Sequence, residues 1–420
     1  MQRWMGWSAV VAGLITLAGC TNGPHFGDAQ GWSSSQKKAF ERILAEDTYA
    51  SLCGLEPLYE QYRQSRDTRI LSRLLVGYTE NLANSCIDLK AFKAVQNRRR
   101  EQKIHTKFVY KLQSVSSSGV LGALREGKSI EQILQPYIPP MPQFRSLLAA
   151  WRGGAAGETG RKIRMSLERA KLMDPDPTRW ETYFLVNIPE FKVRLYENRH
   201  ETLSMRVVVG KKSWQTPVFS ATMKYVVLNP TWNVPDNIAR DEEIPKILRN
   251  PNRLKKKRMV VLRSYDIDST PVDPRTINWR EYLKPEWKKK ELPYKLIQLP
   301  AKGNALGRVK FMFPNGNSVY MHDTPAKSLF SRNFRAYSHG CIRLHKPMVM
   351  LEHLARRGYL SKDWPQVKEL LDSWKLHTVS LSRPIPVHIG YFTAYPAAGG
   401  MVYSPDVYGF DKLMKLKGAR

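Results

Sequence analysis

The side chains that could do chemistry gather in residues 321–347, MHDTPAKSLFSRNFRAYSHGCIRLHKP. This stretch holds three histidines, His322, His339 and His345, around a single cysteine, Cys341. A thiol among imidazoles has three interpretations: it is a zinc ligand, a buried structural side chain, or a nucleophile. Each interpretation needs a different sequence context, so the neighbouring residues discriminate between them.

The spacing disfavours the first two interpretations. Zinc ligands usually come as closely spaced pairs such as CxxC or HxxxH, whereas His322 stands 19 residues before Cys341 and the other candidates crowd around the cysteine. Ser338, His339 and Gly340 make a polar, tightly turning approach to the thiol, which is poor core material. We therefore expect no metal and a reactive Cys341.

A nucleophilic cysteine needs a thiolate, and an ordinary thiol with a pKa near ~8.5 is only slightly ionised at neutral pH. Lowering that pKa to about 6 takes roughly 3.4 kcal/mol of preferential stabilisation of the thiolate. A nearby imidazole can supply it as an ion pair, or accept the proton as a general base. Gly340 lets the backbone turn closely, so that amides around Cys341 could face a developing oxyanion. Taken alone, such a pair would also serve a generic cysteine peptidase.

The motif resembles the signature of the YkuD-type L,D-transpeptidases. His322 is followed by 15 residues and then by Ser-His-Gly-Cys, the order that signature has. The similarity extends over about residues 180–350 and is strongest to the larger, YcbB-like Gram-negative branch, which carries a capping subdomain. Carried over by position, it implies that Cys341 is the nucleophile and His322 the proton donor and acceptor. It also implies that His339 and Gly340 shape the pocket and the oxyanion site.

Two features depart from that family pattern. The common motif ends in Asn, and this chain has Arg343, which could bind a substrate carboxylate in bidentate fashion. No separate peptidoglycan-binding module is recognisable, and a lipid tether and a basic surface would substitute for it. We expect Ser338, Arg343 and Trp232 to contribute to substrate binding.

The resemblance implies acyl transfer on peptidoglycan tetrapeptide stems without a metal or organic cofactor. Cys341 would attack the carbonyl at the L-centre of meso-diaminopimelate, D-Ala would leave, and a second stem's amine would resolve the thioester into a 3→3 cross-link. Within the family, water as acceptor gives an L,D-carboxypeptidase and a lipoprotein lysine gives an anchoring acyltransferase. A non-catalytic peptidoglycan-binding lipoprotein is the alternative from another class, and the intact pair of Cys341 and His322 argues against it.

The charge and the N-terminus indicate where such a protein would work. With 67 Lys and Arg against 37 Asp and Glu, the net charge of +30 suits a polyanionic partner. The start, MQRWMGWSAVVAGLITLAGCTNG, places one charge, Arg3, before a short apolar run that ends in small residues, as a secretory signal does. LAGC at 17–20 matches the lipobox of bacterial lipoproteins. We expect a signal peptide at 1–19 and lipidation of Cys20, with a plain signal peptide as the alternative.

These features predict a periplasmic lipoprotein, and Thr21 after the cysteine resembles lipoproteins sent to the outer membrane. Its partners would be peptidoglycan stems and, through the lipid anchor, the outer membrane, with no nucleic acid. The sequence does not indicate the oligomeric state. In an oxidising compartment Cys53 and Cys86 would pair as a disulfide, which leaves Cys341 as the free thiol.

The chain divides where its hydrophobic period changes. Residues 20–34 form a tether, and residues 35–152 repeat apolar side chains at helical spacing, which predicts a helical scaffold domain. From about residue 182 the pattern alternates as in strands. We therefore predict an α+β protein whose helical domain precedes a mainly β, YkuD-type sandwich or open barrel at 161–400.

Two further segments complete this prediction. Residues 232–294 are rich in Lys, Arg, Pro and Trp and are too long for a hairpin loop. We expect them to form an inserted capping subdomain that binds stems through Lys255, Lys256, Lys257 and the lysines at 288–290. The last part, residues 401–420, is predicted to be a C-terminal tail.

Overall fold

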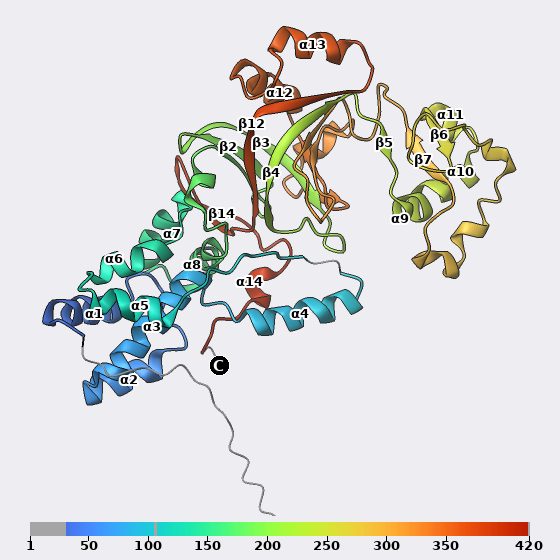
Figure 1. Cartoon of the computed structure of the whole chain (residues 1–420). Helices are drawn as coiled ribbons and strands as arrows, with labels where there is room; N and C mark the ends of the chain where they lie inside the picture. Colours follow the sequence, from blue (N-terminus) through green and yellow to red (C-terminus); the bar gives the residue numbers. More distant parts are fainter. Residues whose placement is uncertain (1–30, 105–106, 419–420) are drawn as a thin grey trace, which may run out of the picture.

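The computed structural model of the chain describes residues 31–104 and 107–418. The predicted signal peptide, Cys20 and most of the predicted tether lie outside the described residues. Figure 1 shows three parts: the N-terminal helices at lower left, a central sheet, and a separate lobe at right. Within the described ranges, none of the helices combines the length and the apolar character needed to cross a membrane.

The N-terminal part is helical because its apolar side chains recur on one face. In the first helix Phe40, Ile43 and Leu44 are buried together, and Ser33 caps the helix start in a capping box with Gln36. The helices of this part, with the short 3-10 turns labelled η, are α1 (Ser34–Glu46), α2 (Glu56–Ser65), α3 (Thr68–Asn84), α4 (Leu89–Glu101), α5 (Ser117–Arg125), α6 (Ile130–Leu134), η1 (Gln135–Tyr137), α7 (Pro142–Arg152), α8 (Gly157–Lys171) and η2 (Pro177–Trp180).

A disulfide joins Cys53 to Cys86 across this part, with 5.9 Å between their Cα atoms and a sequence separation of 33. The backbone N–H of Cys86 donates to Glu168, a fully buried carboxylate on α8. Lys171 and Arg164 of the same helix pair with that carboxylate, so the buried charge is compensated.

The central part is a nine-stranded sheet flanked by α12 (Pro347–Arg356), α13 (Trp364–Asp372) and the turn η7 (Lys327–Ser331). Its strands run in the order β10-β3-β11-β9-β8-β4-β12-β1-β2, and a further pairing joins the last strand, β2, back to β3, the second strand of this order. The bounds are β1 (Tyr183–Asn187), β2 (Lys192–Glu197), β3 (His200–Gly210), β4 (Phe219–Leu228), β8 (Val309–Met312), β9 (Met321–His322), β10 (Ala336–Ser338), β11 (Ile342–Leu344) and β12 (His377–Gly390).

Strand β3 makes this closure possible because it changes partner along its length. Its first half pairs with β2, down to Arg206 opposite Lys192, and its second half pairs with β11 and β10 from Val207 onward. The apolar side chains enclosed by the sheet form one buried cluster with α12 and α13. The predicted fold class, helices followed by a mainly β region, is confirmed.

The lobe at right in Figure 1 has its own small sheet, in the order β5-β7-β6, and its own buried apolar cluster. The small sheet continues to Gln298, past the predicted boundary at 294, because β7 is its central strand. The elements are β5 (Trp232–Asn233), α9 (Asp236–Ile238), the π-helical turn η3 (Ala239–Glu243), α10 (Ile244–Arg249), α11 (Arg253–Lys256), β6 (Met259–Leu262), η4 (Pro274–Thr276), η5 (Glu281–Leu283), η6 (Pro285–Lys289) and β7 (Lys295–Gln298).

Residues 401–420, which the sequence predicts to be a C-terminal tail, are packed against the rest of the chain over their described part. They include most of β14 (Gly400–Tyr403), which pairs with β13 (Ala394–Ala397), and they include α14 (Phe410–Leu413). Tyr408 is fully buried, and its hydroxyl donates to Gly210 O and accepts from Thr216 N. The apolar and hydrogen-bonding side chains of this segment therefore support the end of β3.

Candidate active site

Cys341 stands on a short loop between β10 and β11 that its own residues hold in shape. The Ser338 hydroxyl donates to Cys341 O at 2.6 Å and accepts from Gly340 N at 3.2 Å. Thr216 Oγ1 donates to Gly340 O at 2.7 Å, which ties the loop to the segment after β3. Gly340 has φ +118°, a conformation that L side chains rarely adopt, so a glycine is required at this turn.

The thiol itself is only partly buried, and its Sγ lies 3.8 Å from Ser318 O. It is the free cysteine of the part of the chain that the structure describes. Burial raises the pKa of the Cys341 thiol above its ordinary value. Hydrogen bonds from Tyr320 and the positive charges of Lys310 and Arg343 pull that pKa down, but by less than burial raises it. Cys341 therefore rests as a neutral thiol at pH 7.

His322 is positioned by two neighbouring strands and a backbone carbonyl. It ends β9 and is buried, with 4% of its surface exposed. Its Nδ1–H donates to Asp323 O, which leaves Nε2 unprotonated and able to accept a proton. Burial, and then the positive charge of Arg343, lower the pKa of His322 to about 3, so the imidazole is neutral at pH 7.

Asp323, the residue after His322, is fixed by three donors. Its carboxylate accepts from Arg308 N, Thr324 N and Lys327 Nζ. A Cβ on Gly307 would lie 2.1 Å from Asp323 Oδ2, so this close approach requires glycine at 307. The network holds the carbonyl that orients the imidazole of His322.

The sheet register places several basic side chains in one row. His322 pairs with Lys310 of β8 on one side and with Arg343 of β11 on the other. Paired residues of adjacent strands project to the same face. Tyr320 and Cys341 stand one residue before β9 and β11, and their side chains hydrogen-bond to each other. Lys310 Nζ lies 4.3 Å from the centre of the Tyr320 ring. The row therefore surrounds the thiol with cations that favour its ionised form.

Arg343 is the residue that departs from the family motif, and its guanidinium lacks a partner among the described residues. Among the described residues its guanidinium makes no hydrogen bond or ion pair, and its buried Nε has no partner. Burial lowers the pKa of Arg343, which still leaves it charged at neutral pH. A buried donor without a partner is available to an incoming acceptor.

His339 connects the cysteine loop to the inserted lobe. Its Nε2 lies 2.8 Å from Glu242 Oε1, on the π-helical turn η3, and 3.2 Å from Lys211 Nζ, which follows β3. A ring nitrogen can donate to the carboxylate or accept from the ammonium, but not both at once. Burial lowers the pKa of His339, an effect that Glu242 opposes. The Nε2 of His339 can therefore hydrogen-bond either to Glu242 of the insertion or to Lys211 after β3, but not to both at once.

The structure brings together most of the side chains that the sequence singles out, and separates two of them. Cys341, His322 and the Ser338–Gly340 turn share one end of the sheet, although no hydrogen bond joins the thiol to the imidazole. Trp232 lies on β5 opposite Gln298 and packs against the apolar cluster of the inserted lobe. His345 packs against Phe330, with the two rings tilted and their centres 5.0 Å apart. Within the described ranges, no three His, Cys, Asp or Glu side chains are arranged to hold a metal ion.

Sequence reasoning missed Lys310, Tyr320 and Glu242. Tyr320 could have been predicted, because it stands two residues before His322 in an alternating segment that the sequence predicts to be a strand. Lys310 faces His322 through an antiparallel register, and Glu242 reaches His339 from an insertion. Neither relationship leaves a local pattern in the sequence.

Comparison with known proteins assigns the central part of the chain. Residues 181–387 match the family of L,D-transpeptidase catalytic domains known as YkuD. A Haemophilus influenzae protein named "Putative L,D-transpeptidase" is 32% identical over 257 residues, which is 61% of this chain and 49% of that protein. The chain thus spans about half the length of this curated relative. The match thus identifies residues 181–387, just under half of the chain, as similar to an L,D-transpeptidase catalytic domain of the YkuD type.

Solved structures of that family overlap this chain over half of its length. The L,D-transpeptidase from Mycobacterium smegmatis is 14% identical, covers 50% of this chain and 58% of its own, and gives a TM-score of 0.21. The catalytic domain of the E. faecium enzyme acylated by ertapenem is 14% identical, covers 50% and 96%, and gives 0.20. Both scores are low, and the family assignment rests on the sequence match.

Proposed function

We propose that this chain is a peptidoglycan L,D-transpeptidase that forms 3→3 cross-links through a thioester on Cys341. One observation carries the proposal: within the segment that matches the YkuD family, a free thiol lies two residues before Arg343, the strand partner of His322, whose imidazole has its Nε2 open to a proton. A binding protein would need neither the thiol nor this orientation of the ring.

In the first half-reaction the Cys341 sulfur bonds to the carbonyl carbon of diaminopimelate, and the thiol proton passes to His322 Nε2. The carbonyl oxygen becomes an oxyanion that backbone amides of the Gly340 turn would stabilise. The amide bond to D-Ala then breaks, and its nitrogen takes the proton from His322. In the second half-reaction an amine attacks the thioester, and the thiolate leaves and is reprotonated.

Arg343 is proposed to hold a carboxylate of the donor stem. Its guanidinium is charged, borders the thiol and has no partner in the described structure, and a guanidinium fork matches a carboxylate in two hydrogen bonds. The same cation favours the thiolate that must leave in the second half-reaction. Arg343 in place of the common Asn would thus couple binding of the stem to ionisation of the nucleophile.

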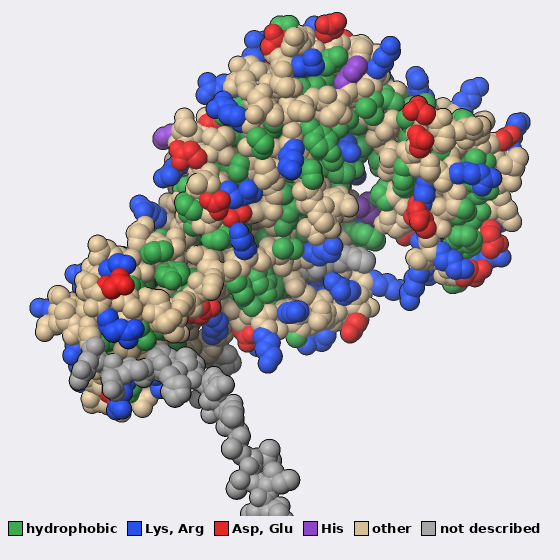
Figure 2. Space-filling model, in the orientation of Figure 1, with side chains coloured by type: hydrophobic (Ala, Val, Ile, Leu, Met, Phe, Trp, Pro, Cys, Tyr) green, Lys and Arg blue, Asp and Glu red, His purple; other side chains and the backbone are tan. Residues whose placement is uncertain are grey.

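The inserted lobe is proposed to act as a cap of the YcbB-like kind. It reaches the cysteine loop through Glu242 and His339, and Figure 2 shows a hollow between this lobe and the central part. A cap over the thioester would exclude water while the acceptor amine binds, which favours transfer over hydrolysis. The outer-membrane lipoprotein location, with Cys20 lipidated, remains a proposal of the sequence, as do the domain limits.

The decisive experiment incubates the purified chain with disaccharide-tetrapeptide and analyses the products by mass spectrometry. We expect a cross-linked dimer with loss of D-Ala, and we expect Cys341→Ala to form neither dimer nor acyl-enzyme. A tripeptide as the sole product would replace the transpeptidase by an L,D-carboxypeptidase. In a parallel reaction with an added lysine-bearing lipoprotein, transfer only to that lysine would indicate an anchoring acyltransferase. Unchanged substrate, together with a thiol that a carbapenem does not acylate, would leave the non-catalytic binding protein.

A further inference from the structure

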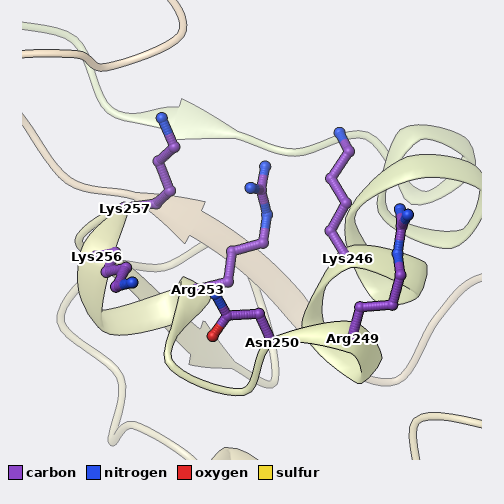
Figure 3. Close-up of a pocket in the computed structure, with 6 residues that line it drawn as sticks. All are labelled: Lys246, Arg249, Asn250, Arg253, Lys256 and Lys257. Carbon is purple, nitrogen blue, oxygen red and sulfur yellow. The ribbon is translucent and has the colours of Figure 1, made fainter.

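A pocket of about 330 Å³ in the inserted lobe is lined almost entirely by cations. It lies between α10 and α11, none of its lining residues belongs to the loop of Cys341, and Figure 3 shows the side chains around it. Its sixth lining residue is an amide, and none of the six is apolar. The lining residues are Lys246, Arg249, Asn250, Arg253, Lys256 and Lys257.

A buried carboxylate holds two of these cations in place. Glu243, 4% exposed at its side chain, accepts two hydrogen bonds from Arg253 and pairs with Lys246 at 2.8 Å. In Figure 3 the side chains of Lys246, Arg249, Arg253 and Lys257 extend to the same side. The pocket is thus preorganised by a charge beneath it, and its cations need not be gathered by the ligand.

The remaining three cations have no counter-charge. Among the described residues, Arg249, Lys256 and Lys257 have no carboxylate within 4.0 Å. Nearby, Asn250 Oδ1 accepts from Asn252 N, which leaves the Asn250 amide nitrogen as a further donor. An array of unpaired cations around one pocket favours an anion that carries several charges in a small volume.

Lining chemistry decides what kind of anion fits. Peptide stems carry single carboxylates spread along a chain with methyl and methylene groups. The carbon surface in the pocket comes from the methylene stems of its Lys and Arg side chains, each of which ends in a cation, and no apolar residue is among the six. Phosphate concentrates two charges on three or more acceptor oxygens, and guanidinium groups bind it in bidentate fashion. We propose that this pocket binds a phosphate-bearing anion, a function beyond the transpeptidase activity and different from the stem binding that the sequence suggested for Lys256 and Lys257.

The pocket adjoins the connection to the catalytic loop. Lys246 lies 3.7 Å from Glu242 Oε2, and the other oxygen of Glu242 contacts His339. An anion in the pocket would therefore stand one side chain away from the contact between the insertion and the cysteine loop. Its binding does not involve the thiol, so it should be unchanged in Cys341→Ala, whether or not the proposed reaction is correct.

The test measures binding of inorganic pyrophosphate to the purified protein by calorimetry at two salt concentrations. We expect saturable binding that Arg249→Ala/Lys256→Ala weakens at least about tenfold, as loss of two charge-assisted contacts should. Both side chains are exposed, so the variant should fold, which its thermal transition checks. Lys288→Ala/Lys289→Ala removes the same charge from exposed positions outside the pocket and is the matched control.

Parallel arms identify the source of the phosphate. Sedimentation with phosphatidylcholine vesicles, with and without phosphatidylglycerol, tests a lipid headgroup with the same two variants. Pyrophosphate binding that depends on Arg249 and Lys256 supports a soluble phosphate. Vesicle binding that depends on Arg249 and Lys256, and that occurs only when phosphatidylglycerol is present, supports a lipid headgroup as the ligand. Equal weakening by both variants would overturn the proposal in favour of a general charge effect, and so would a preference for disaccharide-tetrapeptide over both phosphate probes.

Discussion

Arg343 and His322 are opposite residues of the parallel ladder between β11 and β9, so the guanidinium and the imidazole leave the sheet on the same face. Arg343 lowers the pKa of His322 and also lowers the pKa of the Cys341 thiol. The first effect disfavours a protonated imidazole and the second favours a thiolate. One cation thus opposes protonation of both members of the pair.

The first prediction follows from that shared cation. Arg343→Asn removes a positive charge, so the pKa of His322 and that of Cys341 should both rise. Titration of the imidazole by NMR and the pH dependence of thiol alkylation measure the two values. Arg343→Lys keeps the charge and should shift both less. A fall of either pKa in Arg343→Asn would show that Arg343 does not act on the pair through its charge.

The second prediction concerns the pH dependence of acylation. The pKa of His322 is about 3 and that of Cys341 is raised, so between these limits the pair holds one transferable proton. Acylation by a small β-lactam should therefore be nearly independent of pH from about 5 to 7. In His322→Gln only preformed thiolate reacts. The acylation rate at a given pH should therefore lie orders of magnitude below that of the unmodified protein, and it should increase about tenfold for each unit by which the pH is raised.

Stopped-flow acylation across that pH range checks the second prediction, with His339→Gln as the comparison. Removal of His339 should leave the flat profile, because His339 is not the base. If His339→Gln produced the steep profile and His322→Gln did not, the roles assigned to the two histidines would be reversed.

How much of this site the sequence could predict depends on the range of each relationship. The Ser338–Cys341 loop and the strand that ends at His322 are local, and both were predictable from motif and alternation. The register that places Arg343 opposite His322 joins strands that are adjacent only through the topology of the sheet. Burial of a side chain is equally non-local. The sequence suggested that the pKa of the Cys341 thiol is lowered, whereas burial raises it, so Cys341 and His322 form a neutral pair.

The packing of the C-terminal segment also depends on contacts that are distant in the sequence. Tyr408 supports Gly210 and Thr216 from almost two hundred residues away, and Thr216 in turn holds Gly340 O. Short polar stretches read as a tail when their contacts lie in distant segments. Local periodicity carries no information about such contacts.

The third prediction concerns the disulfide between Cys53 and Cys86. It closes a loop of 33 residues, for which the chain-entropy estimate is roughly 3–4 kcal/mol of stability. Cys53→Ala/Cys86→Ala should lower the free energy of unfolding by about that amount, measured in urea. The acylation rate at 25 °C should stay within about twofold, because neither cysteine belongs to the site. Two free thiols in peptide maps of the native protein would contradict the pairing.

The last prediction addresses the contact between the inserted lobe and the cysteine loop. Glu242 and His339 are both partly exposed, and exposed pairs contribute about 0.2–1 kcal/mol. Glu242→Gln should therefore raise the population of lobes released from the loop by at most about fivefold. Hydrogen exchange should increase in η3 and α9, and the ratio of hydrolysis to transfer on tetrapeptide should rise. Acylation by a small β-lactam needs no cap and should stay nearly unchanged.

Glu281→Gln breaks an ion pair to Lys284 within the same lobe and is the matched control. If both variants kept the native exchange and product ratio, the insertion would not act as a cap through this contact, because the ion pair between Glu242 and His339 would have no consequence for water access to the thioester.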